Sequence, residues 1–405
     1  MGVNVGKNPA PRTGPPHIGF LFNHDQIHQI AHSLPVAVAL AATSAELTIS
    51  VVTTNDRTDA EVSRLLGPTK PHNLKRVRLG VRTRASRLLN RALGRLLPAG
   101  KLLVYRDNLD YFSSLDALVV TERTSLILKN RYGLKDLKMI LIDHGAGDRA
   151  IGFGASTAAF DYILAAGPKI RDRLIAESGV EAGKIIITGY PKFDSVSAQP
   201  AKLPFQANGN PTILYNPHLS PHLSSWFKHG RDVLDWFVAH PEYNLIFAPH
   251  IMLFQRRAVF TVDKLRVALP GVLDKKYFEA SNIHIDLGSP ASTDMTYTNA
   301  ADIYLGDVSS QIYEFLRFPR PAVFIDSHGR DYKDDPNYAH WRAGDVIQSV
   351  DGLGAALGVA RAKHEATYKT IQKLLFDYTF DLTDKPSARR AARAIDDIVK
   401  LAHIN

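Results

Sequence analysis

Residues 301–318 read Ala-Asp-Ile-Tyr-Leu-Gly-Asp-Val-Ser-Ser-Gln-Ile-Tyr-Glu-Phe-Leu-Arg-Phe. This stretch passes from a short apolar segment, 303–305, through a polar turn into a segment with helical character, 309–318. A strand followed by a helix is the building unit of a parallel α/β sheet. The unit recurs along the chain, so the sequence predicts an α/β fold made of doubly wound parallel sheets.

Short β-branched or apolar segments predict the other strands. In the first half they lie at 17–22, 47–53, 116–121, 138–142, 162–166 and 184–188. In the second half they lie at 212–215, 245–248, 283–287 and 322–325. Helical segments separate many of them, at 25–42, 125–132, 169–178, 230–240 and 353–370.

A stretch rich in proline and glycine, 196–211, interrupts this alternation and predicts a linker. We therefore expect a loose tail at 1–16, an N-terminal Rossmann-like acceptor domain at 17–195, a C-terminal nucleotide-donor domain at 212–385 and a final helix at 386–405. Two such halves place a cleft between them. Ligands of such sheets bind beyond the carboxyl ends of the strands.

The composition of the 405 residues excludes several classes of protein. Hydrophobic residues make up 45% and charged residues 22%, which excludes disorder, collagen and coiled coil as the main description. The chain has no cysteine, so thiol catalysis and cysteine-ligated metal centres are excluded. No apolar run is long enough to predict a transmembrane helix.

The net charge of +9 is concentrated in one segment. Residues 67–106 contain eleven Lys or Arg and no Asp or Glu, so the remainder carries −2. Within the expected basic insert, 70–101, four arginines share a helical face flanked by leucines: Arg84, Arg87, Arg91 and Arg95. Such a helix can lie on an anionic membrane surface; the alternative is a helix packed on the protein with a solvated basic face. Nucleic-acid binding is disfavoured because Tyr105 is the only Phe, Trp or Tyr in the segment.

Two histidines follow predicted strands. His144 comes directly after 138–142, within Asp143-His144-Gly145-Ala146-Gly147-Asp148-Arg149, where glycines permit a ligand to approach the backbone. His250 follows 245–248 in the same way. Histidine is the natural general base near neutral pH. We expect the two to face each other across the cleft; the alternative for each is a turn histidine with a structural role.

The turn after 303–305 contains Asp307, Ser309 and Ser310. Free N–H groups at a helix start, with two hydroxyls, favour a diphosphate site, although an ordinary helix cap uses the same residues. Glu314, one turn further on, could reach ribose hydroxyls. Two other strand-end turns are candidates for nucleotide binding: Gly189-Tyr190-Pro191 and Asn216-Pro217-His218.

His24, His28 and His32 are spaced by four residues and would share one face of a helix. Zinc binding would need a further ligand to complete the set. We expect no metal here; the spacing favours a helix that lines the acceptor side of the cleft, or packing histidines.

Taken together, these segments resemble the CDP-glycerol glycerophosphotransferases, the family of teichoic-acid primases and polymerases. The loop 143–149 resembles the HGTPLK-type loop of that family, and 189–194 resembles its G-Y-P-R-N-D. Four further matches follow in the same order: 213–217 with I-L-Y-A-P, 248–250 with R-x-H-P, 301–310 with A-D-v-l-I-T-D-Y-S-S, and 320–324 with K-P-v-i-F. The chain departs from the family at Ala146, Gly147, Arg149, Ile251 and Val308, and so resembles a divergent member.

The resemblance implies a GT-B fold, metal-independent chemistry without a cofactor, and a cytoplasmic location on the inner face of a bacterial membrane. Carried over, His144 is the base, His250 stabilises phosphate charge, and Asp307, Ser309 and Ser310 hold the diphosphate. Gly145, Arg149, His24 and His28 are then candidates for the acceptor side. The implied reaction moves a glycerol-phosphate-type group from a CDP-activated donor to a membrane-borne or anionic glycan acceptor. The alternatives are a GT-B glycosyltransferase with a sugar nucleotide, and an inactive membrane- or polyanion-binding relative.

Overall fold

The computed structural model describes residues 14–24, 27–67, 71–93, 99–143, 145–196, 202–255, 257–261 and 266–404. Contacts divide these residues into two compact units. Unit 1 contains the described residues up to Ile142, Ala159–Leu164 and those from Lys385 onward, and unit 2 contains Asp143–Ala158 and Ala165–Asp384. The division therefore does not fall in the expected linker 196–211. The described part of that segment lies in unit 2, where it forms a 3₁₀ helix at Pro204–Asn208.

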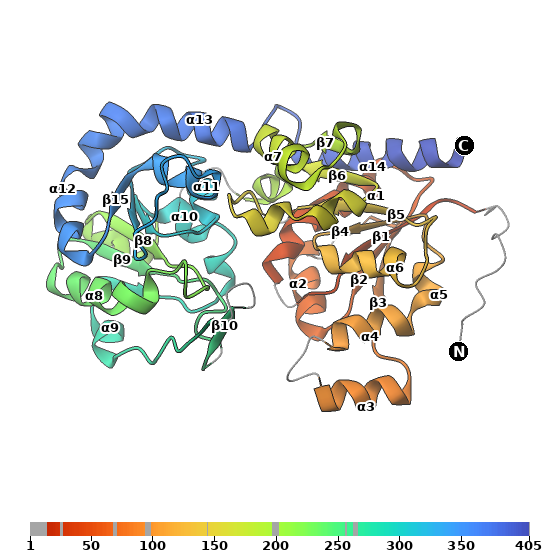
Figure 1. Ribbon diagram of the computed structural model, residues 1–405, viewed down its shortest axis with the longest axis horizontal. Helices are drawn as coiled ribbons and strands as arrows, with labels where there is room; N and C mark the ends of the chain where they lie inside the picture. Colours follow the sequence, from red (N-terminus) through yellow and green to blue (C-terminus); the bar gives the residue numbers. More distant parts are fainter. Residues whose placement is uncertain are drawn as a thin grey trace. The chain divides into compact units, whose positions relative to one another are not determined.

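A parallel sheet with the strand order β3-β2-β1-β4-β5-β6-β7 is formed by the first half of the chain (Figure 1). Its strands are β1 (His17–Phe22), β2 (Thr48–Thr53), β3 (Leu74–Arg78), β4 (Ala117–Val120), β5 (Lys138–Ile142), β6 (Tyr162–Ala165) and β7 (Ile185–Ile187). The central strands are buried on both faces, as their apolar sequences predict. The basic stretch 70–101 is not wholly an insertion, because its first part forms the edge strand β3 beside β2.

The helices of the first half connect these strands. They are α1 (Ile30–Thr43), α2 (Asp56–Leu66), α3 (Arg84–Leu93), α4 (Ala99–Asp107), α5 (Leu109–Phe112), α6 (Ile127–Asn130) and α7 (Pro168–Ser178). The expected helix at 125–132 is shorter, since a 3₁₀ helix at Arg123–Leu126 precedes α6. Pro168 stands at the first turn of α7, where a missing N–H is tolerated.

Unit 2 contains a second parallel sheet with the strand order β12-β9-β8-β13-β14-β15. Its strands are β8 (Thr212–Asn216), β9 (Asn244–Phe247), β12 (Ile283–Ile285), β13 (Ile303–Gly306), β14 (Ala322–Ile325) and β15 (Asp345–Ile347). A separate antiparallel hairpin consists of β10 (Val259–Thr261) and β11 (Arg266–Ala268). The hairpin and β15 were not predicted from the sequence.

The helices of the second half are α8 (Trp226–Ala239), α9 (Lys275–Glu279), α10 (Thr296–Ala300), α11 (Gln311–Phe315), α12 (Leu353–Lys363), α13 (Lys369–Thr379) and α14 (Ser387–Ile404). The expected helix 309–318 is reduced to α11, which has five residues. The expected helix 353–370 continues into α13 through a π-helical turn at His364–Tyr368.

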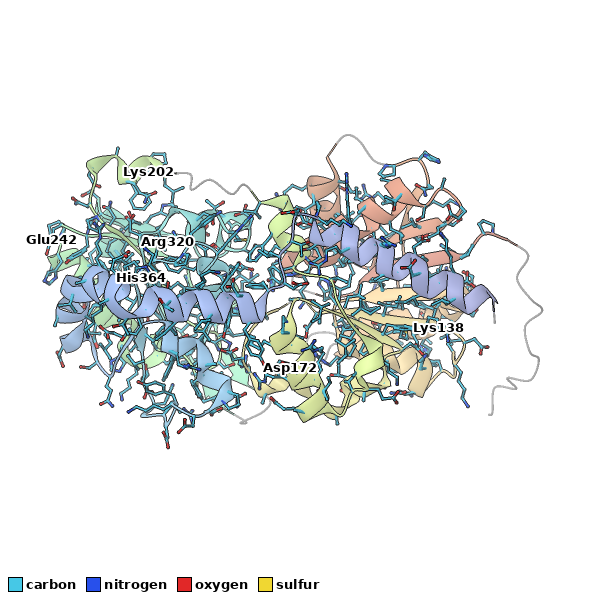
Figure 2. The ribbon with its side chains drawn as sticks, turned by 90° about the horizontal axis from the view of Figure 1, so that it is seen from above. Lys138, Asp172, Lys202, Glu242, Arg320 and His364 are labelled. Carbon is cyan, nitrogen blue, oxygen red and sulfur yellow. The ribbon has the colours of Figure 1, made fainter. Side chains whose placement is uncertain are left out.

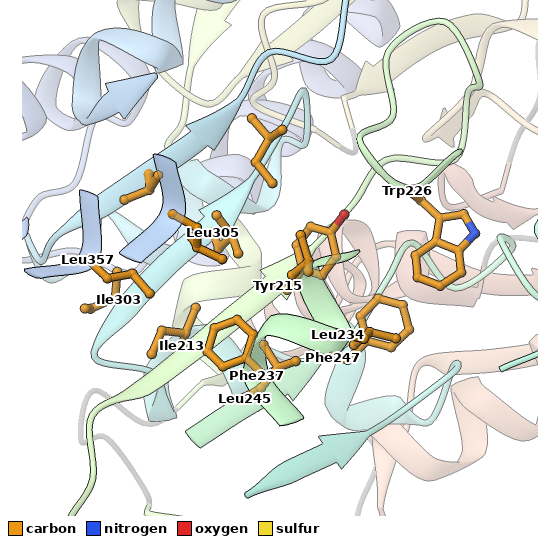
Figure 3. Close-up of a cluster of buried hydrophobic side chains, with 14 of the residues drawn as sticks. Ile213, Tyr215, Trp226, Leu234, Phe237, Leu245, Phe247, Ile303, Leu305 and Leu357 are labelled. Carbon is orange, nitrogen blue, oxygen red and sulfur yellow. The ribbon is translucent and has the colours of Figure 1, made fainter. Parts of the chain in front are cut away.

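The core of unit 2 lies directly beneath the strand ends. Figure 3 shows Tyr215 of β8, Phe247 of β9 and Leu305 of β13 in one buried cluster with Trp226 and Phe237 of α8. Each of these three strand residues comes one or two positions before the polar loop that follows its strand. Close packing of the cluster therefore fixes where the loops begin.

Arg320, labelled in Figure 2, joins the short helices of unit 2. Its guanidinium donates to the backbone carbonyl oxygens of Thr298 (2.8 Å) and Asn299 (3.2 Å), near the end of α10, and of Phe315 (3.1 Å) in α11. Unpaired carbonyls at a helix end favour a cation. Arg320 thus has a structural role, in which it joins the ends of α10 and α11.

Candidate functional site

Three polar loops of unit 2 follow neighbouring strands. His218 follows β8, His250 follows β9, and Asp307 with Ser309 follows β13. Because β9, β8 and β13 are adjacent and parallel, the loops lie at the same edge of the sheet. The segment Gly145–Arg149 reaches this edge too, since Arg149 contacts His218 and Gly147 lies against Ser310.

The carboxylate of Asp307 is fully buried and is used within the protein. It accepts hydrogen bonds from the backbone N–H groups of His218 (2.9 Å), Ser225 (2.6 Å) and Val308 (2.6 Å), and from the Ser225 hydroxyl (2.8 Å). Burial raises the pKa of Asp307 to about 6, although these donors favour the charged form. The predicted direct contact with a diphosphate differs from this arrangement, in which Asp307 holds the backbone of the His218 loop.

The His218 ring contacts two hydrogen-bond donors. Its Nδ1 lies 2.9 Å from the backbone nitrogen of Ser220, and its Nε2 lies 3.0 Å from Nη1 of Arg149. A neutral imidazole accepts at one nitrogen and donates at the other. The Nδ1 atom accepts from the N–H group of Ser220, so the proton of the neutral ring lies on Nε2, where it faces the N–H group of Arg149. Burial and the Arg149 charge also lower the pKa of His218 well below its ordinary value, and a second proton would add a second donor conflict.

His250 adds another donor to the same edge. Its ring centroid lies 6.0 Å from that of His218, at an interplanar angle of 61°. The Nδ1 atom accepts a hydrogen bond from the backbone N–H of Met252 (3.3 Å), which places the proton of the neutral ring on Nε2. Burial, and then the Arg149 charge, lower the pKa of His250 to about 4. The ring is thus neutral at neutral pH and offers an Nε2–H group.

The two serines after β13 have different surroundings. The half-buried Ser309 donates its hydroxyl to Oδ1 of Asn216 (2.7 Å), while Ser310 is exposed. A Cβ atom added at Gly147 would lie 3.0 Å from Cβ of Ser310, so the glycine permits this close approach. Ser309 and Asn216 are therefore brought together, and Ser310 lies beside the 145–149 loop.

The predicted turn residues Gly189, Tyr190 and Pro191 lie elsewhere in unit 2, around Glu314. Oε1 of Glu314 accepts hydrogen bonds from the Tyr190 hydroxyl (3.0 Å) and the Lys192 ammonium (2.5 Å), and all three side chains are buried. Gly189 has a φ of +86°, which glycine adopts without strain. Pro191 opens a 3₁₀ helix at Pro191–Ser195. The proposed ribose contact of Glu314 thus competes with a buried ion pair.

Asp148 and His340 were missed by the sequence reasoning. Asp148 is 2% exposed and accepts hydrogen bonds from Lys169, Tyr313 and His340. Burial opposes ionisation, but Lys169 and the His340 hydrogen bond lower the pKa of Asp148 below its usual range. Burial also lowers the pKa of Lys169 to about 8, against the pull of Asp148. The only sequence signal was the position of Asp148 beside Arg149.

Other predicted residues lie in unit 1. His24 and His32 are buried and His28 is half-buried; α1 begins only at Ile30, after a 3₁₀ helix at Ile27–Gln29. Among the residues that the structure describes, no cluster of three His, Asp or Glu could hold a metal ion. Arg84, Arg87 and Arg91 are exposed on α3.

The catalytic candidate His144 and the membrane candidate Arg95 lie outside the described residues. Gly145 is described and half-buried, at the start of the loop that carries Arg149. The predicted role of His144 therefore stays a prediction. In the described part of the chain, no helix is both long and apolar enough to span a bilayer.

No protein-family model and no curated protein sequence matches this chain. Solved structures do match. Wall teichoic acid polymerase TagF soaked with CDPG has a TM-score of 0.58 at 15% identity, over 96% of this chain and 89% of that chain. The S. aureus MnaA–UDP complex has a TM-score of 0.59 at 14% identity, over 95% and 96%. UDP-GlcNAc 2-epimerase from Neisseria meningitidis, bound to UDP-GlcNAc, has a TM-score of 0.56 at 12% identity, over 95% and 99%. These likenesses and the two parallel sheets show that the protein has the GT-B fold.

Proposed function

We propose that this protein is a transferase that binds a nucleoside-diphosphate-activated donor at the strand ends of unit 2. The observation that carries the proposal is the contact between Arg149 and His218, in which two donors face each other beside the Nε2–H of His250. An anionic oxygen beside these two nitrogens, which lie 3.0 Å apart, would accept from all three groups, and charge-assisted hydrogen bonds of this kind are the strong ones. A phosphate oxygen of the donor has the required chemistry.

The favoured reaction is the transfer of a glycerol-phosphate-type group from a CDP-activated donor. An acceptor hydroxyl oxygen forms a bond to the β-phosphorus, and the bond from that phosphorus to the oxygen of CMP breaks. His144, assigned by the family resemblance, takes the hydroxyl proton, and CMP leaves with the bonding electron pair. Arg149 and the neutral His250 ring stabilise the charge that develops on the phosphoryl oxygens. In this proposal these groups do the work that a metal ion does elsewhere.

The acceptor is proposed to be a membrane-associated or anionic polymer, with the protein bound peripherally at the cytoplasmic face. Support comes from α3, where Leu88 and Leu89 are 69% and 41% exposed beside the exposed Arg84, Arg87 and Arg91. Leucines and arginines on one short helix suit an anionic lipid surface. The second candidate is a glycosyltransferase with a sugar nucleotide, which the fold likeness to UDP-bound structures favours.

The nucleotide that is released tests the proposal. We expect mass spectrometry to detect CMP after incubation of the protein with CDP-glycerol and anionic liposomes bearing a hydroxyl acceptor. Release of a nucleoside diphosphate from a sugar nucleotide would support the second candidate instead. If CDP, UDP, GDP and ADP all leave the melting temperature unchanged, both versions are wrong, because a ligand present at about 100 times its Kd adds about 2.7 kcal/mol of stability.

Two variants and one control variant separate nucleotide binding from the chemical step. Arg149→Gln removes the guanidinium, and we expect about tenfold or more weaker nucleotide binding. Arg361→Gln removes an exposed arginine of α12 in the same unit and should bind as the unchanged protein does. His144→Ala should retain binding and lose turnover; full turnover in this variant would remove His144 from the mechanism.

A further inference from the structure

We propose that His340 is a positioning residue of the candidate site. Its ring, protonated on both nitrogens, ties the 145–149 loop to the loop after β13. The inference rests on the proposed function, because the first loop carries Arg149 and the second holds the backbone of His218. It extends that function to a residue that lies outside the motifs of the family resemblance.

The ring of His340 faces two acceptors. His340 lies in a 3₁₀ helix at Pro336–Ala343 and is 2% exposed. Its Nδ1 lies 2.9 Å from Oδ2 of Asp148, and its Nε2 lies 3.1 Å from the carbonyl oxygen of Asp307. An ionised carboxylate and a carbonyl accept hydrogen bonds and cannot donate them. A neutral imidazole would present a lone pair to one of these oxygens, so only the doubly protonated ring donates to both loops.

The charged groups around the ring are connected through Asp148. Lys169 of α7 donates to Oδ1 of Asp148 (2.7 Å), and the Tyr313 hydroxyl of α11 lies within 2.8 Å of both carboxylate oxygens. Arg173 of α7 donates to the carbonyl oxygen of Asp148 and is paired with Glu177. With one carboxylate and two cations, the group of Asp148, Lys169 and His340 carries one net positive charge.

Further groups contact the ring or lie near it from other segments. Trp341 donates its indole N–H to the Asp307 carbonyl oxygen that Nε2 faces (2.8 Å). The buried carboxylate of the same residue, Asp307, accepts from the backbone N–H of His218. A positive charge on His340 lowers the pKa of His218. The indole satisfies the carbonyl by itself, so the link from Nε2 serves to join the loops and is not needed to satisfy that oxygen.

The contacts of His340 complete a closed circuit of interactions that includes Arg149 and His218, the two donors of the proposed phosphate site. From Asp148 the chain runs directly to Arg149, which contacts His218. From the other side, the backbone of Asp307 accepts from His340 while its carboxylate holds the N–H of His218. His340 thus sets the 3.0 Å separation between the two donors that would bind an anionic oxygen. Preorganised donors bind better because less order has to be created on binding.

The protonation of the ring can be measured without a variant. In the full-length, ligand-free protein with ¹⁵N-labelled histidine, we expect both ring nitrogens of His340 to show bonded protons at neutral pH. One nitrogen without a proton would overturn the proposal. A merely structural packing role would not produce the doubly protonated signature, so this readout separates positioning from packing.

The contribution to binding is tested with His340→Gln, which can donate from only one side-chain group. Inorganic pyrophosphate is the probe, and isothermal titration calorimetry is the measurement. We expect about tenfold weaker binding, as for the loss of a charge-assisted hydrogen bond. The matched control is His364→Gln, since His364 is also buried, at 3% exposure, and lies between α12 and α13 (Figure 2).

The outcomes distinguish this inference from the proposed function. If the unchanged protein binds neither pyrophosphate nor nucleotides, the proposed function fails, while the ¹⁵N measurement still decides the protonation of His340. If the protein binds pyrophosphate and His340→Gln binds it equally well, the positioning role is wrong and the proposed function stands. Equal losses in His340→Gln and His364→Gln would show a general effect of buried histidines, and would also overturn the positioning role.

Discussion

Asp307 shows how one buried carboxylate can hold the backbone of two polar loops. Its carboxylate accepts from three backbone N–H groups and one hydroxyl, and burial raises its pKa to about 6. The folded-state pKa lies above the usual aspartate value, so the stabilising contribution of this group is complete below about pH 4 and is lost as the pH rises through about 6. The cost of ionising it by pH 7 is about 3 kcal/mol.

Asp307→Asn should therefore change the pH dependence of stability. We expect the variant to be less stable at pH 4, because its amide places two N–H hydrogens against these donors, whereas the carboxyl group, protonated at that pH, places only one O–H there. The gap in unfolding free energy between the two proteins should narrow by up to about 3 kcal/mol between pH 4 and pH 7. Urea unfolding at the two pH values measures it. A gap that stays constant would contradict the raised pKa of Asp307.

The residues of the candidate site could be predicted only where the sequence places them at strand ends. His218, His250, Ser309 and Arg149 follow predicted strands, and the structure brings them to one edge of the sheet. His340 could not be predicted, because its partner Asp148 lies 192 residues away and no periodicity connects the two. The burial of Asp307 and Glu314 could not be predicted from the sequence either, since a charged residue in a polar turn is normally solvated.

At the level of elements, buried strands were predictable and charged or very short ones were not. Apolar runs such as β5 and β8 have near-continuous hydrophobic sequences, which the sequence reasoning placed correctly. Strand β3 reads Leu-Lys-Arg-Val-Arg, with one buried residue, and its charges suit the exposed edge of a sheet. The helix α11 ends at Phe315, and Arg320 donates to the carbonyl oxygen of Phe315, which a longer helix would bond internally.

The helix α3 is predicted to bind the surface of anionic membranes. Its exposed surface combines Leu88 and Leu89 with Arg84, Arg87 and Arg91, while Ser86 is buried through contacts with Arg106 and Asp107. We expect the double variant Leu88→Asp, Leu89→Asp to lose binding to vesicles that contain phosphatidylserine, because each basic residue contributes about 1 kcal/mol only when the helix lies at the surface. Co-sedimentation measures the bound fraction.

A control separates a specific role of α3 from a general effect of added negative charge. Val359→Asp and Leu374→Asp change exposed apolar residues of unit 2 in the same way and should leave vesicle binding unchanged. Equal binding by the α3 variant and the unchanged protein would refute the membrane role of α3. The basic face would then be a solvated one.

Across the whole molecule, neither unit is formed by one continuous stretch of the chain. The loop 143–158 precedes the expected linker but belongs to unit 2, where it joins loops from β8, β9 and β13. The final helix α14 follows unit 2 but belongs to unit 1 and packs on α1. A linear reading of domain boundaries could not foresee either return, because both depend on contacts between distant segments.

The helix α14 should stabilise unit 1, to which it belongs, more than unit 2, which it follows in the sequence. Its buried residues recur at helical spacing: Ala388, Ala391, Ala392, Ile395, Ile398 and Val399. Full burial of each branched side chain contributes about 1.5–3 kcal/mol, and Lys400 adds a contact to Glu46 of unit 1 (3.0 Å). A chain ending at Asp384 should therefore lose hydrogen-exchange protection in α1 and β2 while β8, β13 and β14 keep theirs. Loss of protection in both units, or in neither, would show that α14 does not stabilise unit 1 selectively.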